Sequence, residues 1–169
     1  MKIQENNIDS GVIFSYTPKN VDYLGTELKL FSNDDSKNNE IGFLKSVLET
    51  LIEYNPEKEI AVYIGNDVIF VDCGENFNNV YCPKCSTEIT EDWQDFMGKA
   101  SENNFKDLEI KTKCCDFKTD LNSLNYDEKC GFSKVVFTIY SYDPNSISEL
   151  INAIWKKHNL QLIPILAKY

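Results

Sequence analysis

The sequence predicts an α+β fold with a mostly antiparallel sheet and about three helices. Two observations support this prediction. Apolar residues recur at helical spacing in three segments, and short segments with β-branched or alternating apolar residues lie between them in an irregular order. A chain of 169 residues, of which 42% are hydrophobic, is long enough for one domain with its own core and short for two. We therefore expect a single domain over residues 1–169.

The first half of the chain is expected to contain one helix and four strands. The strands are expected at residues 12–16, 23–31, 60–64 and 67–72. One apolar stripe indicates the helix at residues 41–54, and Pro56 ends it. The stripe consists of Leu44, Val47, Leu48, Leu51 and Ile52. Gly65-Asn66 lies between two strand segments and is typical of a two-residue β-hairpin, and residues 32–40 are expected to form a polar loop.

The second half of the chain is expected to contain two helices and three strands. The helices are expected at about residues 90–103 and between Ser146 and Asn159, and the strands at residues 108–112, 133–142 and 160–166. Thr90 suits a helix N-cap, and Ser146 with Glu149 fits a capping box. Asn159 suits a C-cap. Because Pro164 lacks a backbone N–H, we expect the last strand at an edge of the sheet.

Four cysteines in two close pairs form the most informative motif. Cys82 and Cys85 make a C-x-x-C pair, and Cys114 and Cys115 are adjacent after the 28 residues that follow. Two such pairs match a structural Zn²⁺ site, which takes four thiolates in a tetrahedron. Adjacent residues on an extended strand point to opposite faces, so the second pair can share an ion only if the chain turns sharply there. We therefore expect a zinc-ribbon-like knuckle within a metal-binding elaboration over residues 73–130.

Other interpretations of the cysteines stay open. Cys73, Cys130 or His158 can replace one of the four ligands. Cys73 and Cys130 also fit ordinary buried thiols, because neither has a close cysteine neighbour in the sequence. A C-x-x-C pair also serves as a redox dithiol, but that interpretation leaves the second pair unexplained. Since four thiolates leave no open position for water, Zn²⁺ bound by them is expected to be structural and not catalytic.

A longer pattern surrounds these cysteines. It consists of Cys82-Pro83-Lys84-Cys85, Cys114-Cys115, Leu121-Asn122, Leu124, Tyr126 and Gly131-Phe132. In this pattern the second half of the chain resembles a group of small uncharacterised bacterial proteins with Cys-Pro-x-Cys followed by Cys-Cys. The resemblance implies that Cys114 and Cys115 act as a pair in a zinc-ribbon-like arrangement, and it implies no particular activity.

The charge of the chain excludes one common function of four-cysteine sites. The net charge is −10, and all 17 basic residues are Lys. Nucleic-acid backbones repel an acidic chain, and Arg is the usual residue that binds phosphate and guanine, so we expect no nucleic-acid partner. No apolar run reaches the roughly 18 residues of a membrane span. The polar residues 1–9 do not look like a signal peptide, and a cytoplasmic location is therefore expected.

An acidic segment suggests a protein partner. Residues 86–110 carry seven acidic residues and two lysines. Their net charge of −5 is half of the net charge of the chain. A solvated helix face is the ordinary interpretation of such a segment. The functional interpretation is a docking surface for a basic protein, with Trp93 or Tyr81 as an aromatic anchor. The residues expected to form this surface are Glu91, Asp92, Trp93 and Asp95.

The function that the sequence favours is a non-catalytic, zinc-stabilised, acidic protein-binding module. An immunity- or antitoxin-like inhibitor of a basic bacterial protein is one concrete version, because opposite charges speed association. His158 is the only histidine, and its expected position at a helix end favours a capping role over general-base catalysis. The alternatives are an enzyme with a cleft of carboxylates and tyrosines, and a structural subunit of an oligomer.

Overall fold

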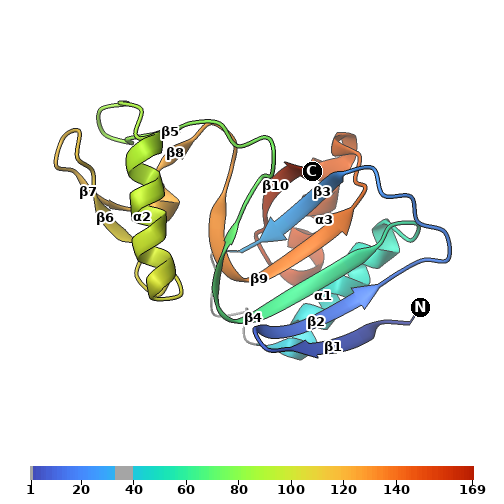
Figure 1. Ribbon diagram of the computed structural model, residues 1–169. Helices are drawn as coiled ribbons and strands as arrows, with labels where there is room; N and C mark the ends of the chain where they lie inside the picture. Colours follow the sequence, from blue (N-terminus) through green and yellow to red (C-terminus); the bar gives the residue numbers. More distant parts are fainter. Residues whose placement is uncertain (1, 33–39) are drawn as a thin grey trace.

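The computed structural model describes residues 2–32 and 40–169, and it confirms the α+β class (Figure 1). Its largest part is a six-stranded sheet in which all neighbouring strands are antiparallel. In spatial order the strands are β1 (Gln4–Ile8), β2 (Gly11–Tyr16), β4 (Ile60–Val71), β9 (Gly131–Tyr140), β3 (Thr26–Phe31) and β10 (Ile163–Lys168). Two helices, α1 (Ile41–Tyr54) and α3 (Ile147–His158), cover one face of this sheet (Figure 1).

The main hydrophobic core lies between the sheet and these two helices. The apolar stripe predicted for α1 is buried in this core. Alternate residues of the central strands face the same core, for example Phe137 and Ile139 of β9. No helix of the described residues lies over the opposite face of the sheet in Figure 1. None of the α-helices in the described ranges has the length and apolar composition needed to span a membrane.

The N-cap expected at Thr90 is wrong, and the C-cap expected at Asn159 is confirmed. Ser146 lies at the expected N-cap position of α3 but does not make the hydrogen bond of a capping box. Thr90 is the first helical residue of its helix, and its hydroxyl accepts a hydrogen bond from Val80 N–H at 3.1 Å. The Ser146 hydroxyl lies 3.0 Å from the Tyr142 hydroxyl and makes no side-chain capping hydrogen bond with α3. Both side chains therefore bond outside their helices. Asn159 takes the left-handed conformation with φ of 49°, and its N–H donates to the Trp155 carbonyl.

The hairpin predicted at Gly65-Asn66 is wrong. The two predicted strands are one continuous strand, β4, with an irregularity between Ile64 and Ile69. Asn66 N–H donates to the Ser10 carbonyl at 2.9 Å, so the glycine and asparagine pack against the turn between β1 and β2. That turn is the actual hairpin at this edge of the sheet. The polar loop predicted at residues 32–40 falls largely on residues 33–39, which lie outside the described residues.

The position of β10 at an edge of the sheet confirms the expectation from Pro164.

A polar cluster holds residue 169 against the sheet. The buried Lys29 ammonium donates to the Asp72 carboxylate at 2.8 Å and also bonds the Tyr169 hydroxyl. The Tyr169 hydroxyl donates to the other Asp72 oxygen at 2.7 Å. Burial raises the pKa of Asp72, but the hydrogen bonds from Lys29 and Tyr169 outweigh burial and lower it.

Residues 73–130 leave the sheet at the end of β4 and return to it at the start of β9, and we call this segment the cysteine module (Figure 1). Its elements are β5 (Val80–Tyr81), α2 (Thr90–Glu102), β6 (Glu109–Lys111), β7 (Lys118–Asp120), a 3₁₀ turn (Leu121–Ser123) and β8 (Asn125–Tyr126). β5 pairs with β8 and β6 pairs with β7, each in a two-stranded antiparallel sheet. Its core residues include Phe96 and Ala100 of α2.

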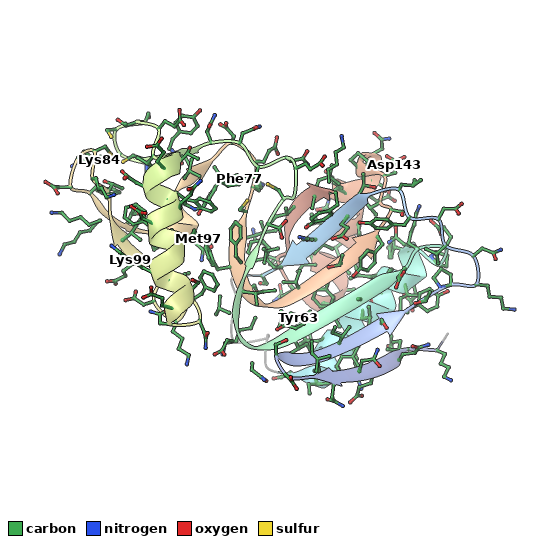
Figure 2. All side chains as sticks on the ribbon, viewed as in Figure 1. Tyr63, Phe77, Lys84, Met97, Lys99 and Asp143 are labelled. Carbon is green, nitrogen blue, oxygen red and sulfur yellow. The ribbon has the colours of Figure 1, made fainter. Side chains whose placement is uncertain are left out.

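The paired ends of β4 and β9 lie between two hydrophobic clusters. Phe70 of β4 and Phe132 of β9 pack into the core of the cysteine module. Val71, the next residue of β4, packs into a third cluster on the side of β3 and β10. Phe77 contacts both clusters, and Figure 2 shows it between α2 and the main sheet. Hydrophobic packing therefore fixes the module to the sheet.

Candidate metal centre

The four cysteines of the sequence motif converge in the cysteine module. All four Sγ atoms lie within 4.8 Å of one another, which is close enough to hold a metal ion. Cys82 Sγ lies 3.6 Å from Cys115 Sγ, and Cys85 Sγ lies 3.4 Å from Cys114 Sγ. Cys82 is buried and Cys115 half-buried, whereas Cys85 and Cys114 are exposed. The group therefore has an inner side in the protein and an outer side at the surface.

The first pair lies on a tight turn between β5 and α2. Cys82 N–H donates to the Thr87 carbonyl at 2.9 Å, and Ser86 N–H donates back to the Cys82 carbonyl at 2.9 Å. Ser86 takes a left-handed conformation with φ of 59°. Cys85 Sγ also lies 3.2 Å from the Thr87 hydroxyl, within hydrogen-bond distance. Figure 2 shows Lys84, between the two cysteines, at the end of the module far from the sheet.

The second pair lies on the same kind of turn, 30 positions later in the chain. Thr112 N–H donates to the Phe117 carbonyl at 2.9 Å, and Asp116 N–H donates to the Thr112 carbonyl at 3.0 Å. Asp116, with φ of 56°, corresponds to Ser86. This confirms the predicted turn beside the adjacent cysteines. Cys115 thus takes the place that Cys85 has in the first turn, while Thr112 takes the place of Cys82.

Thr112 is a residue of the site that the sequence motif did not reveal. It is 1% exposed, and its hydroxyl lies 3.6 Å from Cys115 Sγ and 3.9 Å from Cys82 Sγ. The same hydroxyl accepts a hydrogen bond from Phe117 N–H at 3.2 Å. It therefore connects the backbone of the turn to the inner sulfurs. Aligning the two turns at their 30-residue offset is the signal that would have found it.

Hydrogen bonding divides negative charge unequally among the sulfurs. Burial raises the pKa of Cys82, but hydrogen bonds from the backbone of Cys85 and Lys84 outweigh burial and lower it to about 6. The side chain and backbone of Thr87 lower the pKa of Cys85. Burial, followed by the hydrogen bond with Cys85, raises the pKa of Cys114 to about 12. A cation bound by all four sulfurs must therefore displace a proton from Cys114.

The other cysteines and the histidine lie elsewhere. Cys73 and Cys130 are next to each other, with 3.5 Å between their sulfurs, and neither belongs to the group of four. His158 is the last residue of α3, and its Nε2 lies 2.8 Å from the Thr50 hydroxyl. Burial lowers the pKa of His158, which favours the neutral ring.

The residues expected to dock a protein lie on α2, next to the second cysteine turn. The Lys113 ammonium donates to Asp92 at 2.7 Å and to Asp95 at 3.2 Å. Glu91 is exposed and has no salt bridge among residues 2–32 and 40–169. Two of the three expected carboxylates are thus tied to the residue that precedes Cys114.

Trp93 packs mainly inside the module. Its ring stacks on Phe77 with centroids 4.7 Å apart, and it lies 5.8 Å from the Phe70 ring. Its Nε1–H donates to the Tyr126 hydroxyl at 3.2 Å. The indole is therefore half-buried and already in contact with three aromatic neighbours. A role as a docking anchor has less support from this geometry than a structural role.

No protein-family model matches the sequence, and no curated protein or solved structure is detectably similar to it. The resemblance to bacterial proteins with Cys-Pro-x-Cys and Cys-Cys therefore stays a prediction. What the centre can do chemically follows from its own geometry, namely four soft sulfur donors on two matching turns.

Proposed function

We propose that the four-cysteine centre binds one structural Zn²⁺ and that this ion stabilises a protein-binding module. The main observation in support is the convergence of four Sγ atoms within 4.8 Å. Zn²⁺ prefers four thiolates at about 2.3 Å in a tetrahedron, which corresponds to sulfur–sulfur distances of about 3.8 Å. The closest sulfur pairs, at 3.4 and 3.6 Å, need only small adjustments to reach that geometry.

A structural role is favoured over a catalytic one. Four protein thiolates complete the tetrahedral shell, so no position is left for a reactive water. The ion would join the turn before α2 to the turn between β6 and β7. The strand pairings of the module are only two and three residues long, so these turns have little other support. Binding energy of the metal then becomes folding energy of the module.

Metal analysis tests this part of the proposal. Protein produced in zinc-containing medium is expected to hold one Zn²⁺ per chain, measured by native mass spectrometry and elemental analysis. Cys85→Ser and Cys114→Ser are expected to lose the ion, because each removes a ligand at the exposed side of the centre. Cys73→Ser is the matched control, since it removes a thiol outside the centre and should keep the zinc. Zinc-free wild-type protein that binds no added zinc would contradict the proposal.

We infer that the partner of the module is a basic protein and that it docks on the exposed face of α2. Glu91, Asp95 and Glu102 are exposed and follow one another at spacings of four and seven residues, which places them along one side of the helix. The net charge of −10 adds long-range attraction for a basic partner. An immunity- or antitoxin-like inhibitor of a basic bacterial protein is the concrete version, because acidic inhibitors associate rapidly with basic targets.

Charge reversal on two different faces tests the docking surface. Glu91→Lys with Glu102→Lys is expected to abolish recovery of the basic partner when the tagged chain is purified from host extract. Glu49→Lys with Glu57→Lys changes the net charge by the same amount on exposed positions of another surface, and it is expected to recover the partner normally. Equal loss of partner recovery in both variants would show that binding depends only on the total charge of the chain and not on the face of α2. Recovery of no basic protein at low ionic strength would reject the docking proposal.

A further inference from the structure

Cys73 and Cys130 form a second thiol pair at the junction between the cysteine module and the sheet. Val71 of β4 and Gly131 of β9 form the last residue pair between these two strands. Cys73 lies two positions after Val71, and Cys130 directly precedes Gly131. Their sulfurs are 3.5 Å apart. The chain passes this junction twice, once when it leaves β4 and once when it enters β9 (Figure 1). The pair therefore lies where the whole module is attached.

We propose that Cys73 and Cys130 form a disulfide by exchange with a small-molecule disulfide, and that the bond closes the cysteine module into a covalent loop. A disulfide needs its sulfurs at about 2.05 Å, so each sulfur has to move by less than ~1 Å, which side-chain rotation can supply. The last β4–β9 pair fixes the backbone next to both cysteines. Packing of both side chains with Phe31, Val136 and Ile165 holds the two sulfurs together.

The surroundings indicate which thiol reacts first. Cys73 is 1% exposed, whereas Cys130 is half-buried and lines a surface cavity of about 600 Å³. Phe31, Tyr126 and Lys129 also line this cavity. A small disulfide such as oxidised glutathione can therefore reach the Cys130 sulfur but not the Cys73 sulfur. The Lys129 ammonium would attract the carboxylates of that oxidant.

The exchange proceeds in two steps. Cys130 loses its proton to solvent, and its sulfur attacks one sulfur of the small disulfide, which releases one small thiolate and leaves a mixed disulfide. Cys73 then loses its proton and attacks the Cys130 sulfur, which releases the second small thiolate. Both released thiolates take up protons. Two protein thiols are oxidised to one disulfide, and one small disulfide is reduced to two thiols.

Local electrostatics make the reaction slow at neutral pH. Burial raises the pKa of Cys130, and proximity to Cys73 and Asp72 raises it further. Burial also raises the pKa of Cys73, despite its hydrogen bond with Cys130, and Asp72 and Glu128 contribute in the same direction. Exchange requires the thiolate, so the pair is expected to react slowly and to give a long-lived structural bond.

Peptide mapping of the oxidised full chain tests the inference. Zinc-loaded protein is incubated with oxidised glutathione at mildly alkaline pH, free thiols are alkylated, and the unreduced digest is analysed by mass spectrometry. The expected product joins Cys73 to Cys130 while zinc stays bound. Closing a loop of about 60 residues is expected to raise the melting temperature by roughly 10 °C relative to the reduced chain. Cys73→Ser and Cys130→Ser are both expected to form no such disulfide and to show no increase in melting temperature on oxidation.

The inference is overturned if Cys73 and Cys130 are both alkylated after oxidation, if either is linked to another cysteine, or if the link forms without raising the melting temperature. The map identifies each linked residue, so the result does not depend on the zinc proposal. Repeating it with Cys85→Ser and Cys114→Ser combined, which removes the outer metal ligands, is expected to give the same link. Failure of the zinc site and failure of the thiol pair are thus distinguishable.

Discussion

Removal of the proposed Zn²⁺ is expected to melt the cysteine module while the main sheet stays folded. The module has a small core of its own, to which α2 contributes only two buried residues, Phe96 and Ala100. The main core between the sheet and its two helices consists of a separate set of residues. Loss of the proposed ion would remove the link between the two cysteine turns but leave this main core unchanged. Local unfolding is therefore expected, and not global unfolding.

The size of the effect follows from linkage. A ligand that binds only the folded state stabilises it by about 4 kcal/mol when its free concentration is a thousand times its dissociation constant. One kcal/mol corresponds to about 4–8 °C in melting temperature for a unit of about 60 residues, so a strong chelator is expected to lower the melting temperature of the module by about 16–32 °C. A single transition is expected to separate into two when the ion is removed.

Hydrogen exchange measured by mass spectrometry locates the loss. With chelator, amides of β5, α2 and the β6–β7 hairpin are expected to lose protection, whereas amides of β3 and the first half of β4 keep it. Cys73→Ser is expected to respond to the chelator as the wild-type chain does. An unchanged melting temperature together with unchanged exchange in the module would refute the reasoning, and so would equal loss of protection across both cores.

Three further predictions are tested by four single substitutions, of which the two glycine variants form a matched pair. Gly131→Ala is expected to destabilise the fold by roughly 1–3 kcal/mol in chemical denaturation, because a Cβ there would lie 2.2 Å from the buried Phe31 ring. Gly98 lies in the exposed part of α2, and a Cβ there would have no neighbour within 4 Å. Gly98→Ala is therefore expected to stabilise the fold by about 0.5–1 kcal/mol. A change in stability of the same sign in both glycine variants would contradict this account. The pKa of Asp72 is lowered in the folded state, so its ionised carboxylate stabilises the fold at pH values above the unfolded-state pKa of about 3.9. This stabilisation is lost as the pH falls through the folded-state pKa. Asp72→Asn is therefore expected to be less stable than the wild-type chain at neutral pH and to lose less stability as the pH falls. Chemical denaturation at several pH values measures this difference. A pH profile of stability equal to that of the wild-type chain would exclude this role of the Asp72 carboxylate. Thr112→Val is expected to weaken zinc affinity about 10–100-fold in a competition titration, because it removes the hydroxyl beside the inner sulfurs, and an unchanged affinity would limit Thr112 to packing.

Long periodic elements of the fold could be predicted from the sequence, because burial of one face imposes the pattern. The stripe of α1 and the alternation of β9 are examples. Local signals failed where a tertiary contact used the same residues. Gly65-Asn66 has the composition of a hairpin turn, but Asn66 bonds the neighbouring turn at Ser10 and the strand continues. β1 was missed because its residues are nearly all polar and all exposed, so only pairing with β2 defines it.

At the candidate site, spacing predicted which sulfurs come together, since two close pairs and a turn suffice for that inference. The sequence did not predict the contacts across the module. The proximity of Cys73 to Cys130 depends on the register between β4 and β9, which no local pattern encodes. The packing of Trp93 against Phe77 depends on how α2 lies on the junction. Both are consequences of tertiary packing.

The geometry also connects the two halves of the proposed function. Lys113 lies between Thr112 and Cys114 on the second turn and binds both Asp92 and Asp95 of α2. A metal ion that fixes this turn therefore also fixes the carboxylates on the helix that is proposed to dock the partner. Without the ion, Lys113 and its partners lose their common support, and the acidic face loses its defined shape. Affinity for metal and affinity for a basic partner are thus expected to be coupled, each increasing the other by the same factor.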